Sequence, residues 1–343
     1  CQVAQCQSFK KEQDKFFRIL TYSNTLLFFS FINTPAIAQS IKMNTLVRFI
    51  VLMHSSLQTK LSLPLLHRGK VRDIFDIDKN NMLIVTTDRL SAFDVVFDQP
   101  IPEKGKVLTS IANYWFGKTE HIVQNHLTNI GLEEVLSSDE AEALEGRAIV
   151  VKKLKPLPIE AVVRGYLIGS GWKEYLGSGS VCGIDLPPNM VLAEKLKNPI
   201  FTPSSKAAAG EHDANISFKE VASLVGADIA EQIKKISLAL YNFAEKHALS
   251  RSIIIADTKF EFGLDSENKL TLMDEILTPD SSRFWSLPDY ASGKSPKSFD
   301  KQIIRDYLET LDWDKTPPAP IIPGSIMNKT AEKYRDIQVI LCS

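Results

Sequence analysis

The stretch Ile253–Gly263, with the sequence IIIADTKFEFG, has the pattern of a strand that starts in a core and ends at a site. Successive side chains of a strand point to opposite faces. Asp257, Lys259 and Glu261 therefore share one face, and Thr258 and two phenylalanines share the other. Three charged residues on one face are unsuited to a core, so this face is predicted to line a functional site.

A second strand is predicted at 270–273, directly before Asp274 and Glu275. A loop centred on residues 267–268 would place Glu261 opposite Asp274, with both side chains on the same face. Two adjacent carboxylates repel unless a cation lies between them. Mg²⁺ suits such a pair, because it takes hard oxygen ligands and completes its shell with substrate phosphates. The alternative is a solvated hairpin whose charges are balanced by Lys259.

Two basic segments are candidate phosphate contacts. Gly69 lies between basic residues in RGKVR (68–72), where a glycine lets the backbone approach a phosphate. The spacing is not that of a P-loop, and an exposed basic turn is the alternative. Lys152 and Lys153 end a predicted strand and could reach a phosphate as the strand lysine of kinases does. Their alternative is a lysine pair on an edge strand.

Three loops carry further polar groups. Residues 163–171 combine glycines with Arg164 and Ser170, and residues 278–283 end in Arg283, so both loops suit phosphate binding. The small-residue loop at 201–215 carries Lys206, Glu211, His212 and Asp213. A loop of this kind suits a lid over a substrate, with a merely solvated surface loop as the alternative.

The coarse order of elements predicts an α+β protein of two lobes with a cleft between them. Strands are expected at 71–77, 82–86 and 148–154, and helices at 107–118, 228–247 and 300–311. Ser217 with Glu220, and Asp228 with Glu231, have the spacing of N-terminal caps. The boundary between the lobes is expected near residues 155–159.

Composition excludes several classes of protein. With 44% hydrophobic and 24% charged residues in 343, the chain is globular rather than disordered, collagen-like or coiled-coil. Forty basic and 41 acidic residues give a net charge of −1, which predicts no general attraction to nucleic acid or to an acidic membrane. Four cysteines without a CxxC pair predict neither a zinc site nor a disulfide framework, and favour a cytoplasmic protein.

Residues 1–55 form an extension that is set apart from the fold. The chain does not begin with Met, and an uncharged run at 19–41 follows several basic residues. Polar residues interrupt this run too often for a membrane-spanning helix. Three interpretations stay open: a non-native extension, an organelle-targeting segment and a secretion signal. Met53 is the expected native start, with Met43 as the other candidate.

Seven blocks in order resemble the SAICAR synthetase family (phosphoribosylaminoimidazole-succinocarboxamide synthase) in its longer form. They extend the resemblance over about residues 63–313 and leave the extension outside it. The blocks are RGKVRDIFDID (68–78), TDRLSAFDV (87–95), IPEKGKVLT (101–109), PIEAVVRGYLIGSGWKEY (158–175), FTPSSKAAAGEHDANIS (201–217), IIIADTKFEFG (253–263) and DEILTPDSSRFW (274–285).

The resemblance implies a ligase that joins L-aspartate to carboxyaminoimidazole ribotide (CAIR), with ATP and Mg²⁺, in purine biosynthesis. It implies a small antiparallel, kinase-like ATP lobe at 56–157 and a larger α+β lobe at 158–343, with the active site in the cleft. A monomer is expected, with a homo-oligomer possible and no nucleic-acid or membrane partner. A small-molecule kinase is the alternative, and a non-enzymatic nucleotide-binding protein is a third interpretation.

The resemblance also implies roles for individual residues, which fall into five groups. Glu261 and Asp274 match metal ligands, while Asp257 and Lys259 orient the ribotide and the carboxylate that is activated. The ATP group is Gly69, Lys70, Val71, Arg72, Lys152 and Lys153. The ribotide phosphate group is Arg164, Ser170 and Arg283, and the aspartate and imidazole group is Asp94, Lys206, His212 and Asp213.

Overall fold

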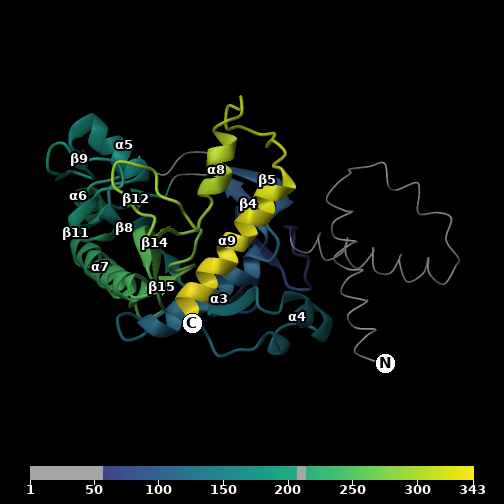
Figure 1. Ribbon diagram of the computed structural model, residues 1–343. Helices are drawn as coiled ribbons and strands as arrows, with labels where there is room; N and C mark the ends of the chain where they lie inside the picture. Colours follow the sequence, from purple (N-terminus) through teal and green to yellow (C-terminus); the bar gives the residue numbers. More distant parts are fainter. Residues whose placement is uncertain (1–56, 207–213) are drawn as a thin grey trace, which may run out of the picture. The chain divides into compact units, whose positions relative to one another are not determined.

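The computed structural model describes residues 57–206 and 214–343 (Figure 1). The described residues all belong to one structural unit. The expectations for residues 1–55, including a start at Met43 or Met53, and those for His212 and Asp213 lie outside the described residues. None of the described helices is both long enough and apolar enough to span a bilayer.

The first sheet has four antiparallel strands in the order β1-β2-β3-β6. The predicted hairpin forms its centre, because Asp78 closes the turn by accepting the backbone N–H groups of Asn80 and Asn81 at 2.7 and 2.8 Å. The strands are β1 (Leu65–Arg68), β2 (Arg72–Asp76), β3 (Asn81–Thr86) and β6 (Ala148–Lys152).

The second sheet has eight strands, with β8 and β14 adjacent at its centre. The chain leaves the first sheet after Lys152 and enters the second at Lys155, close to the expected boundary. The assignment of 56–157 and 158–343 to separate lobes stays a prediction. The strands are β7 (Lys155–Pro156), β8 (Ile159–Tyr166), β11 (Lys195–Phe201), β12 (Ser204–Ser205), β13 (Ala214–Asn215), β14 (Ile253–Leu264), β15 (Leu270–Met273) and β16 (Ser282–Ser286).

Short strand pairs and helices complete the α+β fold, as predicted. The strand pairs are β4 (Arg89–Ala92) with β5 (Val95–Pro100) and β9 (Ser180–Val181) with β10 (Ile184–Asp185). The helices are α3 (Lys104–Thr119), α4 (Ser138–Leu144), α5 (Gly169–Ser178), α6 (Phe218–Val225), α7 (Ala227–Leu249), α8 (Gln302–Leu308) and α9 (Gly324–Cys342), with a 3₁₀ turn at Leu132–Glu134.

The observed helix ends confirm one of the two predicted N-terminal caps. Ser217 and Glu220 form the predicted capping box at the start of α6. The predicted cap by Asp228 and Glu231 is wrong, because α7 starts immediately after Gly226, whose φ of 88° is accessible to glycine, and no side chain caps it. Helix α8 is also shorter than the predicted 300–311.

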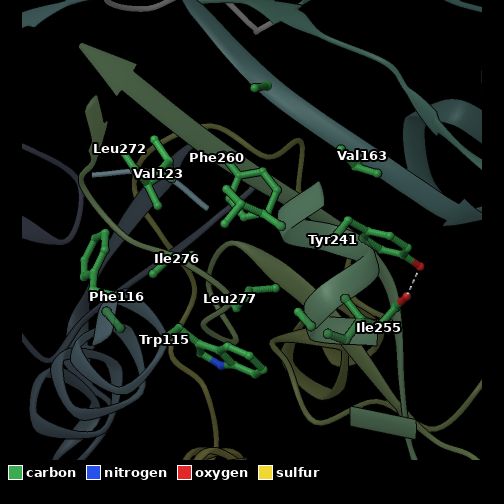
Figure 2. Packing of buried hydrophobic residues seen from close by; sticks show 14 of the residues in the cluster. Trp115, Phe116, Val123, Val163, Tyr241, Ile255, Phe260, Leu272, Ile276 and Leu277 are labelled. Atoms are coloured by element: carbon green, nitrogen blue, oxygen red, sulfur yellow. Dashed lines mark hydrogen bonds between the residues drawn. The ribbon is translucent and has the colours of Figure 1, made fainter. Parts of the chain in front are cut away.

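One face of the second sheet packs against helices and forms the main core (Figure 2). Trp115 of α3 and Tyr241 of α7 are fully buried in this core with Phe260 of β14. The Tyr241 hydroxyl donates to the Ile255 carbonyl at 2.6 Å, the dashed contact in Figure 2. Lys259 and Glu261 are only half-buried, whereas Thr258, Phe260 and Phe262 are buried. The predicted alternation of burial is confirmed over residues 258–262, whereas Asp257, predicted on the same face as Lys259 and Glu261, is buried.

Candidate active site

A cavity of about 650 Å³ is lined by residues of both sheets and of the β4–β5 turn. Its wall includes the charged face of β14 and the glycine loop between β1 and β2. Among the predicted site residues, the lining includes Gly69, Lys70, Val71, Arg72, Asp94, Lys206, Lys259, Glu261 and Asp274. Sequence blocks that lie far apart in the chain thus meet at one cavity.

The register of the β14–β15 hairpin differs from the prediction by one residue. Glu261 pairs with Met273, not with Asp274, because the five-residue loop 265–269 is centred on residue 267. Asp274 follows the strand with a φ of 65°. Both carboxylates nevertheless line the same cavity, although the predicted cross-strand pairing is wrong.

Glu261 is held between two lysines. Lys206 Nζ lies 2.6 Å from Glu261 Oε2, and Lys259 Nζ lies 3.0 Å from Oε1. Lys259 also contacts Glu160 Oε1 at 2.7 Å. Desolvation alone would raise the pKa of Glu261, but Lys259 and Lys206 outweigh it and lower the pKa to about 2. Glu261 is therefore ionised, as a metal ligand must be.

The pKa of Asp274 is shifted in the opposite direction from that of Glu261. Its pKa is raised to about 6 by desolvation and by the neighbouring carboxylates of Glu261 and Glu275, against the opposing effect of Arg72. Arg72 lies 3.1 Å from Asp274 and 2.7 Å from Glu275 Oε2. A cation placed beside Asp274 would relieve this repulsion.

The donor set fits Mg²⁺, which one or two carboxylates hold together with substrate phosphates. In the described part of the chain, no three His, Cys, Asp or Glu side chains are arranged to hold a metal ion by themselves. Glu261 and Asp274 would leave the remaining coordination positions to phosphate oxygens and water.

Of the predicted phosphate residues, Arg283 lines a smaller cavity of about 80 Å³ together with Asp257, whereas Arg164 and Ser170 line neither cavity. Arg164 donates to Ser170 Oγ and to Asp257 Oδ2, both at 2.8 Å, and Arg283 pairs with the same Asp257 oxygen. A Cβ at Gly169 would lie 2.7 Å from Arg283 Nη2, so this glycine makes room for the guanidinium. Arg164 Nε is buried without a hydrogen-bond partner in the described structure, which leaves one donor of the cluster unused.

The glycine loop is supported from behind by Arg89, which the sequence analysis missed. Its guanidinium donates to the carbonyl groups of Gly69 at 2.9 Å and Lys70 at 3.1 Å, and it pairs with the buried Asp73 at 2.7 Å. Lys70 Nζ contacts Asp94 in the β4–β5 turn. Arg89 lies in the block TDRLSAFDV, but nothing in the local pattern indicates which distant loop it supports.

The sequence also did not predict the apolar part of the wall of the larger cavity. Ile74, Met82 and Ile84, from β2 and β3, line the cavity together with Met273. The sequence predicts apolar-rich strands at 71–77 and 82–86, but polar and apolar residues do not alternate along β2. The sequence pattern therefore did not indicate which residues of β2 and β3 face the cavity.

The structure does not bring Lys152 or Lys153 to the cavity wall, contrary to their predicted place at the nucleotide. Lys152 is exposed at the end of β6. Lys153 instead pairs with Asp76 and donates to the Asp78 carbonyl at 2.6 Å, because the acidic β2–β3 turn lies nearer. Their alternative, a lysine pair on an edge strand, describes these positions, because β6 is an edge strand of the first sheet.

Comparisons with known proteins agree with the geometry. A family model described as SAICAR synthetase matches residues 65–320. The phosphoribosylaminoimidazole-succinocarboxamide synthases of Thioalkalivibrio sulfidiphilus and Nitrosomonas europaea are 59% and 58% identical over 276 and 275 residues, covering 80% of this chain and 93% of each relative. The solved SAICAR synthase of Saccharomyces cerevisiae, complexed with SAICAR, has a TM-score of 0.77 and 40% identity, over 83% of this chain and 97% of that chain. The chain therefore belongs to the SAICAR synthetase family.

Proposed function

We propose that this protein joins L-aspartate to the carboxylate of CAIR with ATP, giving SAICAR, ADP and phosphate in purine biosynthesis. The observation that carries the proposal is one cavity that gathers two carboxylates, their lysine and arginine partners and a glycine loop. Family membership supports this ligase and gives no support to the small-molecule kinase alternative.

The chemistry explains why the cavity is rich in charged groups. An amine cannot displace oxide from a carboxylate, so the CAIR carboxylate must first become an acyl phosphate, which the aspartate amine then attacks. Phosphoryl transfer depends mainly on positioning and on neutralising charge. Glu261 and Asp274 would hold Mg²⁺, which when bound offsets negative charge on the transferred phosphoryl group.

The nucleotide is assigned to the side of the cavity formed by the first sheet. The apolar side chains of Ile74, Met82 and Ile84 provide a surface for the adenine ring. The loop Gly69–Arg72 can offer backbone N–H groups and cations to the phosphates. Lys152 and Lys153 are not assigned to this site.

The ribotide is assigned to the second sheet. Arg164, Ser170 and Arg283 would bind its phosphate, since guanidinium groups form strong charge-assisted hydrogen bonds to phosphate. Asp257 fixes both arginines by accepting from each of them. Lys259, on the same face of β14, would orient the CAIR carboxylate that is activated.

The remaining expectations are part of the same proposal. Asp94 and Lys206 would lie on the aspartate and imidazole side, with His212 and Asp213 outside the described residues. We expect a cytoplasmic enzyme that acts as a monomer on small-molecule substrates. The division into an ATP lobe at 56–157 and a larger lobe at 158–343 remains a proposal.

The test is an assay of ADP release by purified protein with CAIR, ATP and Mg²⁺, with and without L-aspartate. The ligase predicts continuous turnover only with aspartate, together with formation of SAICAR. Turnover that is independent of aspartate and phosphorylates a hydroxyl would instead establish a kinase.

A matched pair of variants tests the metal assignment. Glu261→Gln should keep the fold and lower kcat by about a hundredfold or more, because it weakens charge stabilisation in the transition state. Glu267→Gln, at the exposed tip of the same hairpin, should retain wild-type kcat. Near-wild-type kcat and an unchanged Mg²⁺ dependence in Glu261→Gln would remove Glu261 from the metal site.

A further inference from the structure

Asp280 is a buried carboxylate at the wall of both cavities, and three elements converge on it. Lys104 Nζ, from α3, lies 2.7 Å from Asp280 Oδ2. Tyr334, from α9, donates its hydroxyl to Oδ1 at 2.7 Å. Lys301, which precedes α8, places Nζ 3.4 Å from the same Oδ1. Figure 1 shows α9 passing close to both α8 and α3, in agreement with the contacts that α9 makes with each of them.

Only one of these three partners is placed to meet a ligand. The side chains of Lys104 and Tyr334 are fully buried and do not line either cavity. Lys301 lines both cavities, and so does Arg305 on the following turn. Residues four apart on a helix lie on the same face. Lys301 and Arg305 therefore present two adjacent positive charges to the space that the cavities enclose.

In the described structure, Asp280 links Tyr334 to Lys301, because both contact its Oδ1. Lys104 offsets the charge of Asp280 at Oδ2 as an ion pair, and the hydrogen bond from the Tyr334 hydroxyl orients Oδ1. Lys301 Nζ is then held between Oδ1 and the Ser91 carbonyl, to which it donates at 3.3 Å. Without the hydroxyl, Oδ1 loses the 2.7 Å hydrogen bond that orients it, and the ammonium of Lys301 gains freedom to move.

We propose that Tyr334 is a positioning residue that, through Asp280, holds Lys301 where Lys301 and Arg305 bind the carboxylates of L-aspartate. The assignment of aspartate rests on the proposed function. The other two anionic substrates already have cationic partners, at Arg72 for the nucleotide and at Arg164 with Arg283 for the ribotide. A dicarboxylate suits a pair of adjacent cations, and Lys301 at the N-terminal end of α8 together with Arg305 within it supplies such a pair. Tyr334 lies beyond residue 320, outside the part of the chain that the family model matches.

Tyr334→Phe tests the proposal, because it removes the hydroxyl and keeps the ring that packs in the core. We expect the KM for L-aspartate to rise about tenfold, since a hydrogen bond to a charged group is lost. The KM values for ATP and CAIR should stay within about twofold. Tyr290→Phe is the matched control. It also removes a single hydroxyl, which donates to the Ala193 carbonyl at 2.7 Å, and it should leave all three KM values unchanged.

A double-mutant cycle separates positioning from general destabilisation. Lys301→Met should raise the KM for aspartate, and adding Tyr334→Phe should raise it little further, because both act on one contact. A lower melting temperature with an unchanged KM for aspartate, or additive effects in the double variant, would overturn the proposal. Failure of the proposed function would look different, because wild-type protein would then not consume aspartate at all.

Discussion

His126 gives this protein a pH-dependent stability that can be calculated. The residue is fully buried, and neither ring nitrogen has a hydrogen-bond partner in the described structure. Its backbone N–H donates to Leu272 at 3.1 Å and its carbonyl accepts from Lys152 at 2.8 Å, so it lies between β15 and β6. Burial first, and then the charges of Arg72 and Lys152, lower the pKa of His126 from 6.5 to about 3.

The sign and size of the change in the free energy of unfolding with pH follow from proton linkage. Between pH 6.5 and about 3, the imidazole binds a proton in the unfolded chain but not in the folded one, so the free energy of unfolding falls as the pH falls. A pH of about 5 lies about 1.5 units below the unfolded-state pKa of 6.5, and each pH unit in this range lowers the free energy of unfolding by about 1.4 kcal/mol. His126 alone should therefore cost about 2 kcal/mol of stability between about pH 8 and about pH 5.

The assay is urea unfolding of the wild type and of His126→Leu at about pH 5 and about pH 8. The quantity compared is the difference in free energy of unfolding between the two pH values, which should be about 2 kcal/mol smaller in the variant. Other titrating groups contribute equally to both proteins and cancel. His121→Leu, at an exposed position, should behave as the wild type does. An identical pH dependence in wild type and His126→Leu would refute the reasoning.

Three shorter predictions test packing, capping and the nucleotide wall. Gly165→Ala should lower the free energy of unfolding, measured in urea, by about 3 kcal/mol or more, because its Cβ would lie 1.9 Å from Tyr241 Oη. The control Gly177→Ala, in α5, has open space around its Cβ and should raise the free energy of unfolding by up to about 1 kcal/mol. Ser217→Ala should cost about 1 kcal/mol of unfolding free energy, since the α6 capping box is lost. Ile84→Ala should raise the KM for ATP about tenfold in steady-state kinetics, and an unchanged KM would remove Ile84 from the adenine site.

Local patterns were reliable where the physics that they report is local. The alternation along β14 assigned Lys259 and Glu261 to the site because side chains of a strand alternate whatever surrounds them. The capping box at Ser217 was predictable because its hydrogen bonds span only three residues. The register of β14 with β15 was predicted one residue away from the observed pairing, because the geometry of the connecting loop, not the strand pattern, decides which residues are opposed.

The sequence by itself determined the α+β class, the charged face of β14 and, through seven motif blocks, the family. Only the tertiary structure decided that Ile74, Met82 and Ile84 line the cavity, and that Lys153 turns away from it. Only the tertiary structure, too, brought Tyr334 to Asp280. Contacts of this kind join residues that are tens of positions apart, and they depend on how whole elements pack, which no periodicity or spacing along the chain encodes.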